Sequence, residues 1–463
     1  MPRWAKISAV GCAAISFLLA ATVPAFSNEP PTAGSLASPT VAAALSKLVK
    51  LDQLTAAQEH TYIGDFNAAL TTEHKLSRPR AAELSAVTVE THDLAASGLL
   101  TASRLPIVFL TINSNRQWWA HGPMLQYGQR VQFAGSPLLW EFYPGQGIQL
   151  NVLGNFGAAN AACRWGTTTQ CADILNALIP LASLRGGLLT WEYFFSFDGG
   201  VGPWTSAMSQ ATAIEALAYG YQRLHDPSYL TIAAQALALF SAAPPLGVGV
   251  KTAAGMRYVQ YTFAPARSDE VINAFLQTLI GLHTYAQISD SPAAEQLFSE
   301  GDTEALVELP EFNTGAWSLY QPGIEDDLGY HELVTGFLQQ LCAITSAPTY
   351  CTTAADFQLD LHTAPTLSLG THRVTGGGWS PVAFTLSKIS RVGVTLLQGK
   401  RVLFTGTAQF PYGHDAILVA APRKAGSYTL QLSATDLAGN HAEIASALRV
   451  VAPKKVHHHH HGS

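Results

Sequence analysis

The chain has 463 residues and a formal net charge of −6, from 26 basic and 32 acidic side chains. Hydrophobic residues make up 48% and charged residues 13% of the composition, which excludes a disordered chain. The acidic balance argues against a nucleic-acid partner, although an anionic polymer can still bind at a local cationic site. The length predicts about three units, and we expect a multidomain α plus β protein.

The N-terminus has the pattern of a secretory signal peptide, which we place at residues 1–27. Arg3 and Lys6 precede a short apolar stretch, and Ala25 and Ser27 occupy the small-residue cleavage positions. A retained signal anchor is the alternative. No later segment has 18 consecutive apolar residues, so we expect a secreted or cell-envelope protein without a membrane span in the mature chain.

Four cysteines remain once the signal peptide is removed, and they form two local pairs. Cys163 lies close to Cys171, and Cys342 lies close to Cys351. In an oxidising compartment each pair is expected to close a short loop as a disulfide. Zinc is the alternative, but neither pair has CxxC spacing or neighbouring histidines, so we predict no metal site.

The pattern of apolar residues predicts mainly helices up to Cys351. We expect a linker at 28–40, a helical N-terminal region at 41–110, and an (α/α) toroid or barrel at 111–355, where apolar segments alternate with Gly/Pro-rich breaks. An aromatic stretch, Thr190–Phe197, predicts a strand or hairpin arm. The expected helices are Gly147–Phe156, Cys171–Leu184, Ala207–Leu224, Ser228–Phe240, Asp269–Gln287, Ala293–Leu306 and Tyr330–Ile344.

Residues 364–452 predict a small antiparallel β-sandwich. The segment Gly426–Leu430, followed by Asp436–Asn440, resembles the closing hairpin of bacterial immunoglobulin-like (Ig-like) modules, which usually act as spacers. The tail at 453–463 is interpreted as a cloning remnant or a metal-sequestering tract. The expected strands are Pro381–Leu386, Arg391–Gln398, Arg401–Gly406, Ala416–Ala420 and Ser427–Ala434.

Motifs for nucleotide or metal chemistry are absent from the sequence. There is no Walker loop, dinucleotide fingerprint, HExxH or GxSxG, and we expect no cofactor. Asp198-Gly199-Gly200 and Gly376-Gly377-Gly378 predict turns. Glu325-Asp326-Asp327 could bind calcium or serve a glycosidase, but it lacks a ligand-spaced partner, which favours a solvated loop.

Aromatic residues gather beside polar ones in three places: Arg257–Tyr261, Trp317–Tyr320 and Gly329–Glu332. A single tyrosine is usually part of a core with its hydroxyl bonded. Three such groups on the loops of a helical toroid favour a carbohydrate cleft, because sugars stack on aromatic rings and a phenol can act as acid or base.

An ordered series of short stretches from about Trp119 to Ala343 resembles the C-terminal catalytic domain of the D-glucuronyl C5-epimerases. The resemblance implies an (α/α) toroid whose cleft binds a uronate chain, an anionic polysaccharide. The matching stretches are Phe142–Gly147, Trp204–Gln210, Tyr258–Tyr261, Val271–Leu282, Leu309–Gly315 and Gly329–His331.

The same resemblance implies roles for individual residues. The catalytic tyrosines of the family correspond to Tyr261, Tyr320 and Tyr330. Asn273 corresponds to an asparagine of the cleft, and His331 to the histidine that follows the last tyrosine; the alternative for His331 is a satisfied histidine beside a helix start.

Two positions depart from the family pattern. Gln260 stands where the family has a glutamate, and Gly323 stands where it has an arginine. The segment between the second and third tyrosines is also shorter than in the animal enzymes. Gln260, Tyr143 and Trp204, which lie in matching stretches, are expected to contact substrate.

Epimerisation at C5 removes a proton next to a carboxylate, so the enediolate-like intermediate needs a neutralising cation. A tyrosine, with a pKa of about 10, is a poor base at neutral pH unless a cation lies nearby. Arg257 and Arg267 flank Tyr261 and are the predicted clamp, while Arg116 and Arg164 are weaker candidates.

The predicted function is a uronate C5-epimerase that converts D-glucuronate to L-iduronate in a polysaccharide. A polysaccharide lyase is one alternative, since it removes the same proton and then expels the C4 substituent. A non-catalytic secreted glycan-binding protein is the other, and the departures at Gln260 and Gly323 favour it slightly. The sequence does not indicate an oligomeric state.

Overall fold

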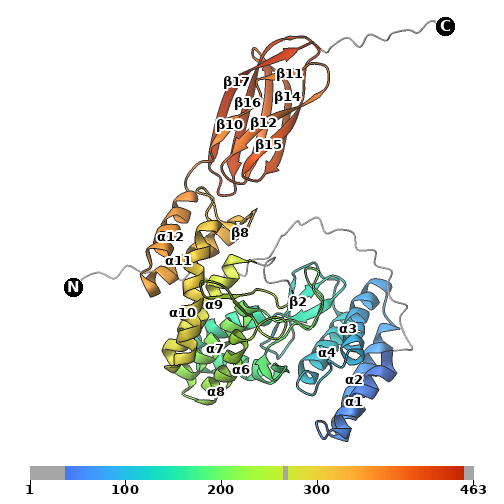
Figure 1. The fold of residues 1–463 in the computed structure, drawn as a ribbon. Coiled ribbons are helices and arrows are strands. Elements are labelled where there is room, and N and C mark those ends of the chain that lie inside the picture. Colours follow the sequence, from blue (N-terminus) through green and yellow to red (C-terminus); the bar gives the residue numbers. More distant parts are fainter. Residues whose placement is uncertain (1–36, 264–269, 453–463) are drawn as a thin grey trace, which may run out of the picture. The chain divides into compact units, whose positions relative to one another are not determined.

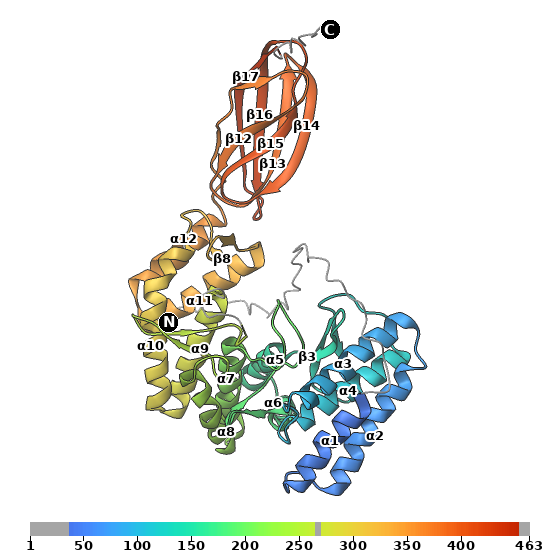
Figure 2. The ribbon, with the colours of Figure 1, turned by 45° about the vertical axis from the view of Figure 1, so that its right-hand side comes forward.

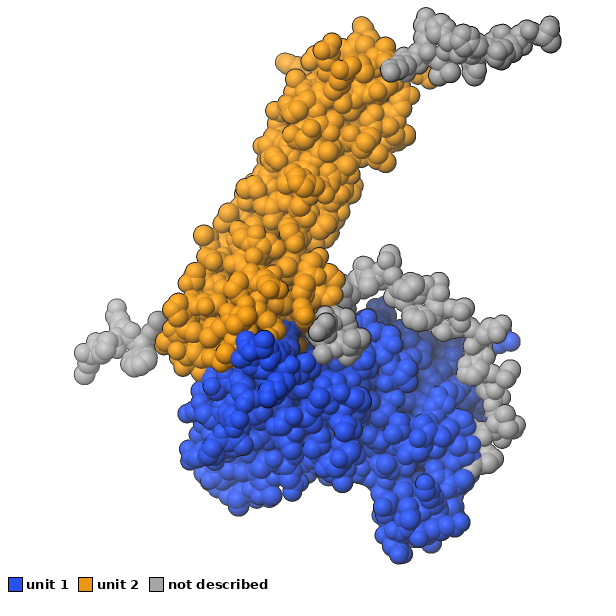
Figure 3. Space-filling model, viewed as in Figure 1, with its two compact units in different colours: residues 1–269, 277–301 blue, residues 270–276, 302–463 orange. Residues whose placement is uncertain are grey.

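The computed structural model describes residues 37–263 and 270–452. They belong to two compact units, one made of residues 1–269 and 277–301 and the other of residues 270–276 and 302–463 (Figure 3). The expected signal peptide, the C-terminal tail and Arg267 lie outside the described residues. The expected linker at 28–40 is wrong at its end, because the first helix already begins at Ala37.

The first unit opens with four helices that lie side by side in Figures 1 and 2. Thr55 and Gln58 form a capping box, each bonding the backbone of the other, and this fixes the start of the second helix. The fourth helix was not predicted, and it continues across residue 110. The four are α1 (Ala37–Lys50), α2 (Ala56–Glu73), α3 (Arg78–Ala96) and α4 (Leu105–His121).

A three-stranded antiparallel sheet follows, with β1 (Arg130–Gln132), β2 (Leu139–Tyr143) and β3 (Gly147–Leu150) in that order. The expected helix Gly147–Phe156 is therefore wrong in its first half. Gly147 has φ +72°, and a Cβ there would lie 2.7 Å from Asn115 Oδ1, so the position suits a glycine turn. The helix begins only after Asn151, whose side chain accepts a hydrogen bond from Gly154 N at 2.7 Å.

Helix α7 (Ala207–Leu224) is the core helix of the first unit, because every residue from Ala207 to Ala218 is buried. Its small side chains allow close packing of neighbours; a Cβ at Gly220 would lie 2.4 Å from Leu175 Cδ1. The other elements here are α5 (Val152–Trp165), α6 (Thr168–Leu178), η1 (Ile179–Leu181), β4 (Ser183–Arg185), β5 (Leu188–Thr190), α8 (Ser228–Leu237), η2 (Ala238–Ser241), β6 (Gly249–Lys251) and β7 (Met256–Tyr258).

The two expected disulfides are present. The Cys163–Cys171 bond joins α5 to α6, and the Cys342–Cys351 bond joins two later helices. The expected helix Cys171–Leu184 is too long, because α6 ends at Leu178 and the chain enters β4 at Ser183. A Pro at position 180 removes the backbone donor that a continuing helix would need.

Two helices, α9 (Ile272–Ser289) and α10 (Pro292–Glu308), have residues in both units. The second unit continues with η3 (Leu309–Phe312), β8 (Leu319–Gln321), β9 (Ile324–Glu325), α11 (Leu328–Thr345) and α12 (Pro348–Asp360), the last of which was not predicted. Consecutive helices form contacting pairs, α5 with α6, α7 with α8, and α11 with α12. The (α/α) toroid stays a prediction for this arrangement.

The C-terminal β-rich region (residues 364–452) contains two sheets (Figure 1), and side chains from both form one hydrophobic core. The sheet orders are β10-β12-β15 and β11-β17-β16-β13-β14. The Ig-like assignment stays a prediction. The strands are β10 (Leu367–Leu369), β11 (Arg373–Thr375), β12 (Trp379–Leu386), β13 (Ser390–Gln398), β14 (Arg401–Phe410), β15 (Gly413–Ala420), β16 (Gly426–Asp436) and β17 (His441–Val451).

Five of these strands, β12 to β16, correspond to the predicted ones. Buried and exposed residues alternate along β12, β13, β16 and the second half of β15, whereas β14 has no buried residue. Strands β10 and β11 are only three residues long and carry too little alternation to be predicted. Across residues 37–263 and 270–452, no helix has the length and hydropathy needed to cross a bilayer.

Candidate active site

Eight aromatic side chains of the first unit form a continuous group, here called the aromatic cluster. Trp204 is at its centre, stacked on Tyr193 at 4.2 Å between ring centroids and edge-on to Tyr261 at 5.4 Å. Backbone bridges Tyr193↔Trp204 and Phe197↔Gly200 hold the central residues. The members are Tyr127, Tyr143, Tyr193, Phe195, Phe197, Trp204, Tyr261 and Phe263.

The turn between β2 and β3 orients Tyr143 toward this cluster. Glu83 accepts hydrogen bonds from the backbone of Gly145 at 2.9 Å and Gly147 at 3.3 Å, which fixes the turn. The side chain of Gln146 then accepts a bond from Ser196 N at 3.1 Å, so the turn also holds the segment that carries Phe195 and Phe197. The Phe142–Gly147 stretch thus positions aromatic rings through its turn.

Burial separates the base of the cluster from its rim. Trp204 is only 4% exposed and donates its indole N–H to Phe195 O at 2.8 Å. We therefore reassign Trp204 from substrate contact to the base of the cluster. Tyr127 is 50% exposed, and Tyr143 and Tyr261 are half-buried, so these rings form the accessible rim. A sugar ring can stack there on an aromatic face.

Two phenols of the cluster, Tyr193 at the base and Tyr143 at the rim, are neutral at physiological pH. Burial raises the pKa of Tyr193 to about 12, against the opposing effect of its hydrogen bond to Ser209. Burial also raises the pKa of Tyr143 well above its ordinary value, and nearby Glu141 adds to this. Neither phenol is therefore a general base at neutral pH, and each serves in hydrogen bonding or packing, as where Tyr193 OH accepts a bond from Leu153 N at 3.2 Å.

The predicted polar residues near Tyr261 lie in two environments. Gln260 is half-buried and accepts a hydrogen bond from Ser206 Oγ at 3.2 Å, at the N-terminus of α7. Arg257 is 4% exposed in β7, so it is an interior cation. Of the weaker candidates, Arg164 lies over Trp165 at 4.3 Å.

The second unit brings two predicted catalytic residues together. Tyr320 lies on β8 and Tyr330 in the first turn of α11, with ring centroids 5.1 Å apart. Asp327 caps α11 by accepting a hydrogen bond from Tyr330 N at 2.8 Å. Tyr330 is 8% exposed and Tyr320 is half-buried, so the pair has one accessible edge.

A tight turn lies at Gly323, the position where the resemblance implies an arginine. Gly323 has φ +82° between β8 and β9 and follows Pro322, an arrangement that fits a type II turn. An arginine in that conformation would be strained. The short hairpin gives Tyr320 a fixed backbone position.

A buried polar chain lies beneath the tyrosine pair. Ser318 Oγ shares a 2.5 Å hydrogen bond with Asp326 Oδ2 and a 2.8 Å bond with Nδ1 of His331. The other nitrogen of His331 bonds Phe357 O at 2.9 Å, and its ring stacks on Trp317 at 3.7 Å. His331 is fully buried, so we reassign it from substrate contact to a positioning residue.

One proton is shared along this chain. A carbonyl partner requires a proton on Nε2 of His331, and Ser318 N points at Nδ1 at 3.3 Å, so Nδ1 is an acceptor and the imidazole is neutral. Burial, assisted by Lys388, lowers the pKa of His331 to about 4. Burial raises the pKa of Asp326 to about 7, so its carboxyl holds the proton below that pH.

The interpretation of Glu325-Asp326-Asp327 as a solvated loop is wrong. Asp326 is 1% exposed, and Asp327 caps α11. Glu325 accepts hydrogen bonds from Ile389 N at 2.6 Å and Tyr412 N at 2.7 Å, both in the β-rich region. These three acidic residues therefore hold the β8–β9 hairpin, which carries Tyr320, and the start of α11, which carries Tyr330.

The β-rich region contributes a second support through Lys388, which is 1% exposed. Its ammonium pairs with Asp436 at 2.7 Å, donates to Asp360 O at 2.7 Å, and lies 5.2 Å from the Trp317 ring. Trp317 in turn stacks on His331. The β-rich region is thus part of the same interior as the tyrosine pair.

Asn273 lies in the first turn of α9 and is 4% exposed. Its Oδ1 is buried and accepts no hydrogen bond from any residue that the structure describes. No group of His, Cys, Asp and Glu side chains in the described ranges could hold a metal ion.

Most of the rim was missed from the sequence. Tyr127 and Phe263 gave no signal, since neither lies in a matching stretch that singles out its ring. For Phe197 a signal existed: aromatic residues at alternate positions from Tyr193 onward place three rings on one face of an extended segment.

Comparison with known proteins identifies the class of the central segment. Residues 185–358 match the family model described as "D-glucuronyl C5-epimerase C-terminus". This match confirms the resemblance predicted from the sequence, and the matched segment includes Tyr261, Tyr320 and Tyr330. It supports a carbohydrate epimerase. No curated protein matches the chain.

Two solved structures are similar in part. A sugar epimerase from a ruminal bacterium shares 13% identity with a TM-score of 0.33, over 46% of this chain and 59% of that one. Cellobiose 2-epimerase from Bacillus thermoamylovorans shares 9% identity with a TM-score of 0.35, over 60% of this chain and 74% of that one. The first similarity thus spans less than two thirds of the ruminal protein.

Proposed function

We propose that the chain is a uronate C5-epimerase that converts D-glucuronate to L-iduronate within a polysaccharide. Tyr261, Tyr320 and Tyr330 are its catalytic residues. The family match carries this proposal, because the matched segment contains all three tyrosines. The partner of the enzyme is an anionic uronate chain, and the reaction needs no redox step.

The chemistry begins with a proton on C5, next to the uronate carboxylate. A phenolate removes this proton, and the electron pair of the broken C–H bond moves onto the carboxylate as an enediolate. A phenol on the opposite face then donates a proton to C5, which inverts the centre. The position of Tyr330 supports the role of phenolate base. It lies at the positive end of the α11 dipole, which favours a negative charge on the phenol oxygen.

The surroundings of the tyrosines supply positioning. The buried chain of Asp326, Ser318 and His331 fixes the backbone on both sides of the Tyr320–Tyr330 pair. A rigid support of this kind holds reacting groups in place, which is a large part of catalytic rate enhancement. In the first unit, the aromatic rim supplies faces on which sugar rings stack.

The test is the product formed from uronate polymers, with heparosan first. Iduronate signals in the proton NMR spectrum of the product, without loss of chain length, are expected. Vinyl protons and shortened chains would establish a lyase. Binding without any new signal across the panel would leave a glycan-binding protein, with Gln260 and Gly323 as the positions that differ from the family.

The expected domain plan belongs to the same proposal. We assign a signal peptide to 1–27, a helical N-terminal region to 41–110, a toroid to 111–355 and an Ig-like sandwich to 364–452. Two disulfides suit an oxidising compartment, which supports export to the cell envelope or beyond. Mass spectrometry of the N-terminus of the exported protein tests the cleavage position.

A further inference from the structure

The β-rich region differs from the rest of the chain in charge. Residues 364–452 contain eight Lys and Arg side chains and three Asp and Glu side chains, a formal net charge of +5. The total is −6, so the other residues together carry −11. A polyanion is repelled by such a surface at long range, and its approach is favoured through the basic region.

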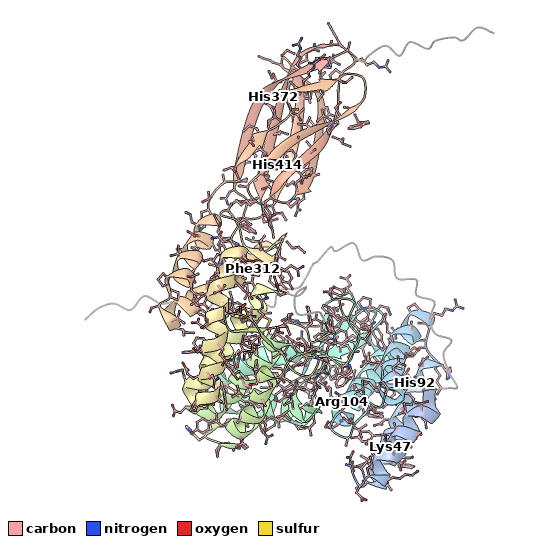
Figure 4. The ribbon with its side chains drawn as sticks, in the orientation of Figure 1. Lys47, His92, Arg104, Phe312, His372 and His414 are labelled. Atoms are coloured by element: carbon pink, nitrogen blue, oxygen red, sulfur yellow. A yellow bond between two sulfur atoms is a disulfide. The ribbon has the colours of Figure 1, made fainter. Side chains whose placement is uncertain are left out.

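The basic side chains lie mostly at one end of this region. The opposite end contacts the helices, as Asn440 Nδ2 donates to Leu361 O at 3.0 Å and Tyr412 N donates to Glu325. Figure 1 shows the strands running lengthwise between the two ends. In Figure 4, His372, which precedes the first of these basic residues, lies nearer the free end than His414 does.

Chain connectivity places six cations at the free end, here called the basic end. It consists of the loop 376–378, the turn at 399–400 and the segment 421–425, together with the strand ends that join them. All six are exposed, and none forms an ion pair with an acidic residue of the described ranges. They are Arg373, Lys400, Arg401, Arg423, Lys424 and Arg449.

The three acidic residues of the region are at the other end. Asp436 is paired with the buried Lys388, Glu443 contacts His441 at 3.0 Å, and Asp415 lies at the start of β15. The basic end therefore has no internal countercharge within its own fold.

Like charges are even placed side by side there. Arg373 and Arg449 are direct partners in the parallel pairing of β11 with β17, and both face solvent while their neighbours Val374 and Val450 are buried. Adjacent strands are about 4.8 Å apart, so the two guanidinium groups repel each other in the free protein. An anion placed between them removes this repulsion and can accept hydrogen bonds from both guanidinium groups.

A depression of about 790 Å³ opens beside Arg373, a volume in the range of small-ligand sites. The wall carries the hydroxyl groups of Thr371, Thr375 and Ser380, and Arg373 supplies a charge. Two of these hydroxyls also bond the protein, since Thr371 Oγ1 accepts from Ala383 N at 2.8 Å and Ser380 Oγ donates to Thr375 O at 3.3 Å. The wall is completed by Val374, Pro381, Val451 and Ala452.

An exposed tryptophan completes the set of sugar-binding groups. Trp379 is 66% exposed at the start of β12, and it packs edge-on to Phe404 of β14 at 5.5 Å and 83°. Its ring is outside the wall of the depression, because Trp379 and Ser380 face opposite sides of the strand. The loop Gly376-Gly377-Gly378 leads directly into it and has no side chains to cover the ring. An exposed indole held in one orientation is suited to stack on the apolar face of a sugar.

We propose that the basic end of the β-rich region is a second binding site, which takes a uronate polysaccharide. The choice of polymer rests on the proposed function; the cations, the hydroxyl-lined depression and Trp379 select an anionic sugar chain. The site holds the polymer while another stretch of it reacts, which raises the effective concentration of substrate. The β-rich region is then a substrate-capture module as well as a support.

The test compares two charge reversals of equal size in the full chain. Arg449→Glu changes the basic end, and Arg391→Glu is the matched control, an exposed arginine at the other end of the same sheet. Heparosan binding is measured by biolayer interferometry with the polymer immobilised. Arg449→Glu is expected to weaken binding at least tenfold and the control less than twofold, and Trp379→Ala should also weaken it severalfold.

Salt and competitors supply the second measurement, which uses only the wild type. Binding should weaken steeply between 50 and 300 mM NaCl, because exposed charges are screened. Polymer should protect Lys400 and Lys424 from acetylation. The proposal would be overturned by an equal loss of polymer affinity in Arg449→Glu and Arg391→Glu, or by lysines that stay unprotected when polymer is bound. It would also be overturned if neutral dextran or DNA bound as tightly as the uronate polymer.

Catalysis separates this site from the proposed function. Turnover of a short oligosaccharide should be unchanged in Arg449→Glu, while KM for the long polymer rises at least fivefold at constant kcat. Binding at the basic end without any turnover would refute the epimerase and leave this site standing. If Arg449→Glu and Arg391→Glu both turn over the long polymer with the same KM, the second site is refuted and the epimerase stands.

Discussion

Replacing Asp326 with Asn should make the stability of the protein depend on pH in a way that the wild type does not. Burial raises the pKa of Asp326 from 3.8 to about 7 and lowers that of His331 from 6.5 to about 4. Between pH 4 and 6.5 the folded pair carries one proton, on Asp326, and the unfolded pair also carries one, on His331. The wild-type pair therefore contributes almost no pH dependence in this window.

The two contributions have opposite signs. Asp326 binds a proton more tightly when folded, so its contribution to the free energy of unfolding falls by about 4 kcal/mol from pH 4 to 7. His331 binds a proton less tightly when folded, so its contribution rises by about 3 kcal/mol from pH 4 to 6.5. In Asp326→Asn only the rise in the free energy of unfolding that comes from His331 remains, because the amide stays neutral at every pH. The amide can still donate a hydrogen bond to Ser318.

Urea unfolding at half-unit steps from pH 4.5 to 7 measures this difference by linear extrapolation. The free energy of Asp326→Asn minus that of the wild type should increase by about 1.4 kcal/mol per pH unit. Other buried acids, such as Glu90 and Glu215, are common to both proteins and cancel. Asp356→Asn, on an exposed residue of α12, controls for the substitution. A constant difference across the range would show that Asp326 does not hold the proton.

Three further changes test other parts of the structure. Lys388→Met leaves a buried carboxylate unpaired and should cost about 3–5 kcal/mol in urea unfolding, whereas Arg391→Met should cost under about 1 kcal/mol. Gly202→Ala puts a Cβ 1.9 Å from a carbonyl oxygen and should destabilise by about 1–3 kcal/mol; Gly64→Ala, with open space in α2, should stabilise by about 0.5–1 kcal/mol. Tyr127→Ala should raise KM for the polymer severalfold at unchanged kcat, and a fall in kcat alone would contradict its place on the rim.

Helix positions could be predicted where apolar periodicity and caps agree. Helix α7 matches its predicted bounds because Ser206 caps its start and the left-handed conformation of His225, with φ +57°, ends it after Leu224. The prediction failed at Gly147, where a left-handed turn interrupts an apolar run, and at Leu178, where a helix gives way to a strand. Periodicity cannot distinguish a short buried strand from a helix turn in such runs.

The site was predictable only where a motif lies in one stretch of chain. Tyr320 and Tyr330 were found through the family resemblance, and the structure places their rings 5.1 Å apart. The supports were not predictable, since Glu325 bonds Tyr412, 87 residues later, and Lys388 bonds Asp360, 28 residues earlier. Contacts of this range depend on tertiary packing and leave no local pattern.

Epimerisation exchanges one hydrogen atom, the proton on C5 of the uronate, with the solvent. Wild type and the variants Tyr320→Phe and Tyr330→Phe are incubated with heparosan in deuterated buffer, and deuterium at C5 is measured by NMR and mass spectrometry. We expect deuterium at C5 together with iduronate for the wild type, and at least a hundredfold slower incorporation for both variants. Wild-type iduronate formation that is undiminished in both variants would contradict the assignment of the tyrosine pair, and a wild type without incorporation on any uronate polymer would contradict the epimerase itself.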